Sequence, residues 1–275
     1  MVKGLSVHTN VGQLAALNQL GLTNRDLNNT QLRVTSGLKI NNPQDDSSGF
    51  QISTRIKGDI AGNKAVKTAL DLGATTVDVA ISAGKNIKEL LVEMKGKVIQ
   101  ANQAALDASS RTALNNDFVA LRTQIDTVTR AAAFNDKNIV ESGGTQLLVL
   151  SSQDGSVITV APQNMSATGL SIQSNALLTS ANAATARAAI ETAIVLIGDK
   201  LAALGAAARS IEIQGQFTNE VVDNLTVALG SIVDADLAEE SAKLQALQIQ
   251  QALGVQALNI ANAGPQQLLG LFGVR

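Results

Sequence analysis

The feature that most restricts the fold of this chain is a seven-residue repeat in two long stretches. Apolar or small residues recur at alternating intervals of four and three residues from Ile52 to Val98, with Asp59 and Asn63 as interruptions. The same spacing returns from Ile190 to Ile232, where Gly215 and Thr218 thin the apolar contact. This spacing is typical of long α-helices that pack in a coiled-coil-like bundle. The first stretch carries Gly73 and Gly84. Because a glycine inside a helix costs roughly 1 kcal/mol relative to alanine, we expect a neighbouring backbone to approach closely there.

Between the two repeats the chain continues as a shorter helix and then changes its period. Residues 114–132 keep the helical spacing, whereas the apolar segments 146–150 and 156–160 flank Gln153-Asp154-Gly155, a sequence that favours a hairpin turn. Residues 142–182 are rich in Ser, Thr, Gly and Asn, so we expect this segment to be exposed and variable. The predicted fold class is mainly α, a long antiparallel helix bundle with a small β-hairpin region.

Both ends of the chain are apolar and nearly uncharged. No charged residue occurs between Lys3 and Arg25 or between Lys243 and Arg275, with His8 taken as neutral. After Lys243 the apolar residues follow helical spacing but spread over most of the helix circumference. The Gln and Asn residues among them make this stretch too polar for insertion into a membrane. Such a helix needs partners on several sides.

The two end helices cannot bury enough surface by pairing with each other alone. Ordering about seventy residues costs on the order of 100 kcal/mol of backbone entropy, whereas each fully buried Leu or Ile contributes roughly 1.5–3 kcal/mol. We therefore expect both ends to be poorly ordered in the monomer and to become ordered when several copies surround them. The sequence predicts a protein that assembles with itself.

The composition argues against several other classes of function. The chain has 275 residues and a net charge of −2, which gives no indication of nucleic-acid binding. With 0 Cys and a single histidine, His8, a disulfide, a zinc site and a cysteine nucleophile are not expected. Asp45 and Asp46 are interpreted as helix-capping residues and not as a catalytic pair. We expect no enzymatic activity, no cofactor and no metal, and we expect no cleaved signal peptide, since the N-terminus lacks the apolar core of one.

Three motifs resemble those of bacterial flagellin, the subunit of the flagellar filament. The sequence Ser-Gly-Leu-Lys-Ile-Asn at residues 36–41, followed by Asp-Asp-Ser-Ser-Gly at residues 45–49, is similar to the N-terminal signature of that family. The run from Asp234 to Leu244 is similar to its C-terminal signature, and Phe134-Asn135 also fits. The resemblance covers both ends and both long helices.

The resemblance implies a subunit of the hollow helical filament that bacteria use as a swimming propeller. Residues 1–44 and 234–275 would form an inner helical layer on assembly, residues 45–141 and 183–233 the helix bundle, and residues 142–182 the hairpin and exposed segment. The implied partners are copies of the chain, other flagellins, the flagellar export apparatus with an export chaperone, and the filament cap and junction proteins. The implied location is the extracellular filament, reached without a cleaved signal peptide.

Three sets of residues are candidate sites. The assembly interface is predicted at apolar residues of the two ends: Leu14, Leu17, Leu20, Leu27, Leu237, Leu244, Leu247, Ile249, Leu253, Leu258, Ile260, Leu268 and Leu269. Polar residues predicted to line the filament channel are Gln248, Gln251, Asn259 and Asn262. O-glycosylation is common on the outer surface of the family, although a solvated loop explains its candidates here equally well: Ser142, Thr145, Ser166, Thr168, Ser171 and Ser174.

Two other functions compete with that of a filament subunit. A hook–filament junction protein shares the terminal helices but caps rather than polymerises, and it usually matches the C-terminal signature less fully. A monomeric coiled-coil adaptor would need charged flanking positions and stable ends. The uncharged stretch after Lys243 argues against an adaptor.

Overall fold

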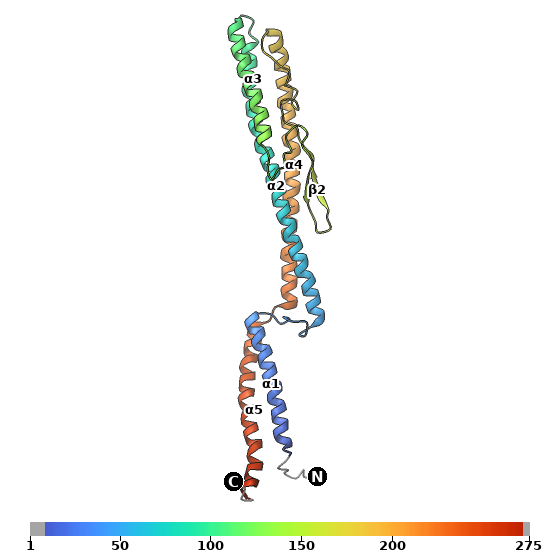
Figure 1. The fold of residues 1–275 in the computed structure, drawn as a ribbon, viewed down its shortest axis with the longest axis vertical. Helices are drawn as coiled ribbons and strands as arrows, with labels where there is room; N and C mark the ends of the chain where they lie inside the picture. Colours follow the sequence, from blue (N-terminus) through green and yellow to red (C-terminus); the bar gives the residue numbers. More distant parts are fainter. Residues whose placement is uncertain (1–8, 272–275) are drawn as a thin grey trace. The chain divides into compact units, whose positions relative to one another are not determined.

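The computed structural model describes residues 9–271, and the side chains of residues 9–263. This part of the chain forms, in order, α1 (Val11–Ser36), α2 (Ser47–Ala101), α3 (Ala108–Ala131), β1 (Leu147–Leu150), β2 (Val157–Val160), α4 (Ser180–Val233) and α5 (Leu237–Leu271) (Figure 1). It divides into two compact units. One consists of Met1–Gly58 with Leu225–Arg275, and the other of Asp59–Asn224. The prediction of a mainly α fold with a small hairpin is confirmed.

The seven-residue repeat supplies the core of the Asp59–Asn224 unit. One cluster of buried side chains joins α2, α3 and α4. Its largest fully buried members from these helices are Leu70, Ile87, Leu91, Met94, Phe118, Ile125 and Ile190. The helical repeat is therefore confirmed as the core of this unit. Its first predicted position is wrong, because Ile52 is exposed whereas Ser53 and Ile56 are buried.

The segment after the hairpin is packed into the same core. Met165, Leu170, Ile172 and Leu177 are fully buried. The expectation that all of residues 142–182 are exposed is therefore wrong for this part, and the segment belongs to the same compact unit as the bundle. The polar composition of this segment gave no indication that four of its apolar residues are buried.

Side chains of α3 hold this segment in place. The Asp126 carboxylate accepts a hydrogen bond of 2.9 Å from the amide of Ala167, and the Asn115 side-chain oxygen accepts one of 2.8 Å from the amide of Leu177. The Arg122 guanidinium donates a bond of 3.0 Å to the carbonyl of Asn175. These bonds satisfy backbone groups that would otherwise be costly to bury, so an irregular segment can lie against a helix.

The hairpin has the predicted turn and packs on α2. Its strands pair antiparallel with Leu147 opposite Val160 and Leu150 opposite Val157. At its turn the Gln153 amide donates a hydrogen bond of 2.7 Å to the carbonyl of Asp59. On the other side, the Gln214 amide of α4 donates a bond of 2.8 Å to the carbonyl of Ser151. The hairpin is thus fixed to both long helices of its unit.

The glycines of the α2 repeat make room for side chains, which corrects the expectation of a neighbouring backbone. A Cβ atom at Gly73 would lie 2.5 Å from Cγ2 of Val149 in β1. At Gly84 it would lie 2.7 Å from Cδ2 of Leu201 in α4. Valine and leucine side chains fill the grooves that the two glycines leave.

These contacts predict opposite effects for two glycine-to-alanine changes in α2. Gly73→Ala should lower the free energy of unfolding by roughly 1–3 kcal/mol, because Val149 is β-branched and cannot move away easily. Gly96→Ala is the matched control, since the space around its Cβ position is open, and it should raise that free energy by up to about 1 kcal/mol. Urea unfolding followed by circular dichroism measures both. Equal effects of the two substitutions would contradict the packing of the hairpin on Gly73.

Candidate assembly interface

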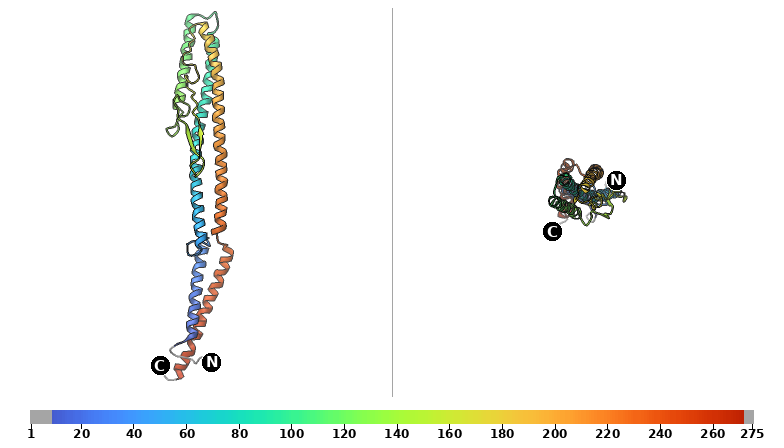
Figure 2. Two further views of the ribbon diagram at one scale, coloured as in Figure 1. Left: turned by 90° about the vertical axis from the view of Figure 1, so that its right-hand side faces the viewer. Right: turned by 90° about the horizontal axis from the view of Figure 1, so that it is seen from above.

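Helices α1 and α5 lie side by side in the unit that contains both chain ends (Figure 1 and Figure 2). Their contact follows one stripe on each helix, at alternating intervals of three and four residues. We call these residues the terminal seam: Leu20, Thr23, Leu27 and Thr30 of α1, and Glu240, Leu244, Leu247, Gln251 and Gly254 of α5. In α1 only Thr23, Leu27 and Thr30 are fully buried. The pair therefore covers a narrow part of each helix.

Polar bonds fix the register of the terminal seam. The Gln251 amide donates a hydrogen bond of 2.7 Å to the side-chain oxygen of Asn24. Near the start of α1, the Asn10 side chain donates a bond of 2.7 Å to the carbonyl of Ala261. Because these bonds join positions that are widely spaced along the pair, a shift of one helix along the other would break both.

The first family-like motif forms the connection between α1 and the end of α4. Gly37 ends α1 in the left-handed conformation with φ of 72°, which a glycine adopts without strain. Its carbonyl accepts a hydrogen bond of 2.9 Å from the amide of Ala235, and the amide of Lys39 donates one of 2.7 Å to the carbonyl of Val233. A short antiparallel bridge between Leu38 and Asp234 results. The two signature sequences therefore meet in space.

The Asp-Asp-Ser-Ser-Gly motif shapes the turn into α2. The Asp45 carboxylate accepts hydrogen bonds from the backbone amides of Asn42 at 2.9 Å and Asn41 at 3.0 Å. These bonds, with a smaller contribution from the positive charge of Arg33, hold the pKa of Asp45 below its usual value. Asp46 accepts bonds from the amides of the first turn of α2, so its predicted capping role is confirmed. The capping role expected for Asp45 is wrong, because Asp45 bonds to the amides of the turn before the helix. The turn is thus a structural element.

Gly49 leaves room for neighbouring side chains in this turn. A Cβ atom there would lie 2.5 Å from Cδ1 of Ile40, the isoleucine of the same family-like motif. That distance is much shorter than a normal contact between carbon atoms. The two halves of the motif are therefore in contact, with Ile40 packed against Gly49.

An ion pair joins α1 to α5 at the base of the terminal seam. Nη1 of Arg33 lies 3.1 Å from Oε1 of Glu240, and Glu240 is buried. The second carboxylate oxygen of Glu240 has no hydrogen-bond partner among the described residues. The arginine that pairs with Glu240 therefore belongs to the same chain.

Outside the terminal seam, both helices expose large apolar side chains. On α1 these are Val11, Leu14, Leu17, Leu22 and Leu32. On α5 they are Leu237, Ile249, Leu253, Val255 and Ile260. An isolated exposed leucine needs no explanation, but a series along two adjoining helices is typical of a surface that another protein covers.

The structure separates the predicted interface residues into two groups. Leu27 and Leu247 are buried within the chain, and Leu20, Leu244 and Leu258 are partly buried. The exposed group is Leu14, Leu17, Leu237, Ile249, Leu253 and Ile260, while the side chains of Leu268 and Leu269 lie outside the described residues. Sequence reasoning did not include four further exposed apolar residues: Val11, Leu22, Leu32 and Val255. Their spacing relative to the terminal seam was the signal that could have identified them.

The four predicted channel residues also differ in their surroundings. Gln248 and Asn259 are exposed and eleven residues apart, about three helical turns, so they lie on the same side of α5. Gln251 and Asn262 are partly buried, and Gln251 is bonded to Asn24. Gln248 and Asn259 are the two that this chain leaves fully accessible.

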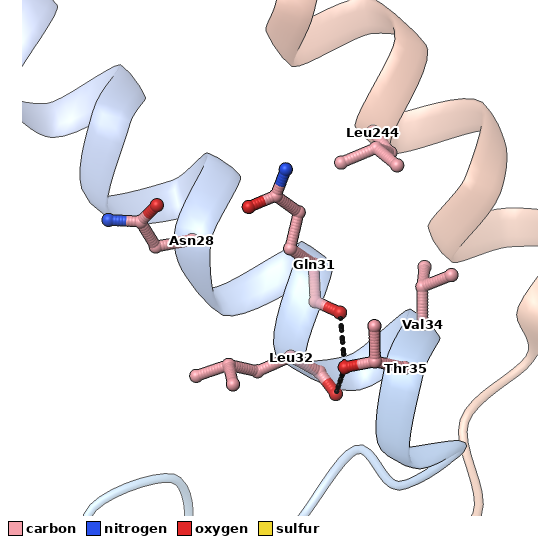
Figure 3. Close-up of a pocket in the computed structure, with 6 residues that line it drawn as sticks. All are labelled: Asn28, Gln31, Leu32, Val34, Thr35 and Leu244. Carbon is pink, nitrogen blue, oxygen red and sulfur yellow. Dashed lines mark hydrogen bonds between the residues drawn. The ribbon is translucent and has the colours of Figure 1, made fainter.

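A groove opens on one side of the helix pair (Figure 3). It has a volume of about 620 Å³ and is lined by Asn28, Gln31, Leu32, Val34 and Thr35 of α1 with Leu244 of α5. The Thr35 hydroxyl donates hydrogen bonds to its own helix, 2.8 Å to the carbonyl of Gln31 and 3.1 Å to that of Leu32. No charged side chain lines this α1 groove.

The candidate glycosylation residues are not equivalent. Ser142, Thr145, Thr168, Ser171 and Ser174 are exposed. Ser166 is buried, and its hydroxyl donates a bond of 2.7 Å to Asn164 and accepts one of 3.2 Å from the amide of Gly169. A buried and fully bonded hydroxyl cannot reach a glycosyltransferase, so Ser166 is removed from the set.

The described residues contain neither a metal-binding cluster nor a membrane-spanning helix. Among the described residues, no group of His, Cys, Asp or Glu side chains is arranged to hold a metal ion. Within residues 9–271, no helix combines the length and apolar character needed to cross a membrane.

Comparison with protein families gives two matches that together span most of the chain. The model of the bacterial flagellin N-terminal helical region matches residues 7–145, and that of the bacterial flagellin C-terminal helical region matches residues 187–272. Both signature motifs lie inside these ranges. The unmatched interval includes the hairpin and the segment packed on α3.

Individual relatives agree with these family matches. The chain is 38% identical to flagellin FljK of Caulobacter vibrioides over 97% of this chain and 98% of that protein. It is 35% identical to a flagellin of Brucella melitensis biotype 1 over 97% of this chain and 99% of that protein. The crystal structure of Bacillus cereus flagellin aligns with a TM-score of 0.49 and 21% identity, over 56% of this chain and 88% of the other.

The Arg33–Glu240 ion pair gives a prediction for the terminal seam. Arg33→Leu should destabilise the α1–α5 pair by about 1.5–3 kcal/mol, because the buried carboxylate loses its charged partner. Arg25→Leu is the matched control, since Arg25 is exposed on the same helix and forms no ion pair among the described residues. Hydrogen exchange of the α5 amides in the full chain measures the effect. Arg33→Leu/Glu240→Leu should recover most of the loss, and equal protection in the two single variants would contradict a structural role for the pair.

Proposed function

This chain belongs to the bacterial flagellin family, and from this premise we propose how its end helices build a filament. As a flagellin it is a structural subunit of the bacterial flagellar filament, which drives swimming motility. The observation that carries the proposal is that α1 and α5 pair through a narrow stripe and leave long uncharged apolar faces exposed. Copies of the chain cover those faces when the filament forms.

The exposed and buried leucines have different roles in this proposal. Leu27 and Leu247 hold the helix pair together within each copy, because the chain itself buries them. The exposed group from Leu14 to Ile260 forms contacts between copies. Each such side chain contributes roughly 1.5–3 kcal/mol when fully buried, so several are needed to offset an association cost of about 4–15 kcal/mol. This requirement links ordering of the ends to polymerisation.

The polar side of α5 faces the hollow centre of the filament in this proposal. Gln248 and Asn259 lie on one side of the helix and make no contact that would prevent them from facing water. Neutral amide side chains keep a channel wet without binding a charged chain that passes through it. Gln251 and Asn262 lie closer to the terminal seam and contribute to the channel wall from its edge.

The partners beyond copies of the chain follow from the family. Four flagellins of one Caulobacter vibrioides strain are each 38% identical to this chain, so we propose that related flagellins can share a filament with it. We further propose that the chain leaves the cell through the flagellar export apparatus with the help of an export chaperone, without a cleaved signal peptide. The ends of the filament would then contact cap and junction proteins.

We propose O-glycosylation at the exposed hydroxyls Ser142, Thr145, Thr168, Ser171 and Ser174. All five lie in the Asp59–Asn224 unit, and none is buried as Ser166 is. The native protein is expected to be heavier than the 28.4 kDa of the bare chain by whole sugar residues, and intact-mass spectrometry measures this. Substituting the five hydroxyls by alanine should restore the bare mass, whereas Ser166→Ala should leave the sugar in place. A native mass equal to that of the bare chain would contradict the proposal.

The filament proposal predicts the effect of a short truncation. Deleting residues 268–275 removes Leu268 and Leu269 from the predicted interface. Electron microscopy of the purified full chain under polymerising conditions should show filaments, and the truncated chain should give none. Circular dichroism should show that the bundle of the truncated chain is still helical, since its core lies in the Asp59–Asn224 unit. Normal filaments from the truncated chain would refute the role of these residues.

A further inference from the structure

We propose that an apolar stripe on α5 of one copy docks in the α1 groove of a second copy. The stripe, called here the outer stripe, consists of Ile249, Leu253 and Ile260, and the groove is the one lined by Leu32, Thr35 and Leu244 with their neighbours. This inference rests on the proposed function and adds which two surfaces meet. In the proposed contact, one copy contributes α5 and the other copy contributes the groove beside α1.

The α1 groove is built to receive an aliphatic side chain. Figure 3 shows Leu32 and Val34 of α1 and Leu244 of α5 around the opening. Leu32 is 54% exposed although it lines a concave surface. Since both bonds of the Thr35 hydroxyl go to carbonyls of its own helix, Thr35 can offer its methyl group to an incoming side chain without leaving an unsatisfied donor.

The outer stripe has the matching chemistry. Ile249 is 62%, Leu253 58% and Ile260 69% exposed, and the spacing of four and seven residues places them on one side of α5. No charged residue occurs on α5 after Lys243 within this stretch. These side chains are aliphatic, exposed and free of neighbouring charge, which is what a groove without charged lining can bury at least cost.

A chain cannot place its own outer stripe in its own groove. Ile249 and Leu253 each follow a seam residue, Leu247 and Gln251, by two positions, which rotates them about 200° around the helix axis. They therefore point away from α1, while the groove lies beside the terminal seam. The occupant must come from another molecule, and the assembly of this family supplies a second copy.

The electrostatics of both surfaces favour this pairing. Arg33 lies in the same stretch of α1 as the groove, but its guanidinium is paired with Glu240. The polar groups at the groove are the side-chain amides of Asn28 and Gln31. These side chains form no hydrogen bond among the described residues. On α5, the exposed Gln250 and Gln256 flank the outer stripe and can bond to such amides. Neutral amides at the edge of an apolar contact satisfy one another without the cost of burying charge.

The proposed contact is of the kind that produces an open polymer. Two different patches meet, so each copy keeps one free groove and one free stripe after it binds a neighbour. A contact between identical patches would close after two copies, whereas this arrangement can add further copies and gives an open filament when the rotation between copies does not close a ring. The inference therefore accounts for growth of a filament instead of a dimer.

Because the chain has 0 Cys, single cysteines can test the contact directly. Copies carrying Leu32→Cys are polymerised together with copies carrying Ile249→Cys, Leu253→Cys or Ile260→Cys, and the filaments are oxidised. A disulfide needs Cα atoms about 4.4–6.8 Å apart, so only residues in contact will join. We expect at least one of the three mixtures to shift from the 28.4 kDa chain to a disulfide-linked dimer. Thr35→Cys, a smaller change in the same groove, replaces Leu32→Cys if the latter prevents polymerisation.

The controls use exposed positions on other faces of the same helices. In one control Leu22→Cys takes the place of Leu32→Cys, and in the other Gln248→Cys takes the place of the cysteine in the outer stripe. Neither mixture should give a dimer. Electron microscopy before oxidation shows separately whether filaments form. Filaments without any groove-to-stripe dimer, or with equal dimer from Leu22→Cys, would overturn the inference and leave the proposed function intact. Absence of filaments from the unmodified chain would instead refute the proposed function. A dimer formed by Leu253→Cys copies alone would show that the outer stripes of two copies contact each other, which also overturns the inference.

Discussion

A pair of helices can cover only one side of each member, and this constraint governs the unit that holds both chain ends. The terminal seam fully buries three residues of α1, none of them larger than Leu27. Hydrogen bonds from Asn10 and Gln251 fix the register of the pair, and the Arg33–Glu240 ion pair joins the two helices at the base of the terminal seam. The remaining apolar surface is left for neighbours. The proposed contacts between copies would bury this remaining surface.

The Asp59–Asn224 unit follows the opposite principle. Three helices, the hairpin and the segment around Met165 and Ile172 enclose one cluster of fully buried side chains. Val149 of the hairpin fills the space beside Gly73, and Leu201 of α4 fills the space beside Gly84. Helix α3 bonds the irregular segment through Asn115, Arg122 and Asp126. This unit has a core of its own, although it also exposes large apolar side chains such as Leu72, Val195 and Phe217. One chain thus combines a part that encloses a core with a part whose two helices meet along a narrow stripe.

Patterns that depend on local spacing could be predicted from the sequence, and contacts between distant segments could not. The helical repeats, the hairpin and the capping role of Asp46 all follow from neighbouring residue types. The burial of Ser166 depends on Asn164 and on packing against α3, which composition does not report. The division of the interface leucines into seam and exposed residues required the position of α1 relative to α5. The α1 groove required it as well, since Leu244 lies more than two hundred residues from Thr35.

The ion pair at the base of the terminal seam also bears on the order of events during synthesis. Arg33 and Glu240 are 207 residues apart in sequence, so α1 is made long before its partner exists. Closing so large a loop is slow and contributes nothing until the last helix is available. A nascent chain consequently carries an unpaired first helix through most of its translation. For a protein that we propose is exported through the flagellar apparatus, a late-forming contact of this kind delays commitment to the folded form.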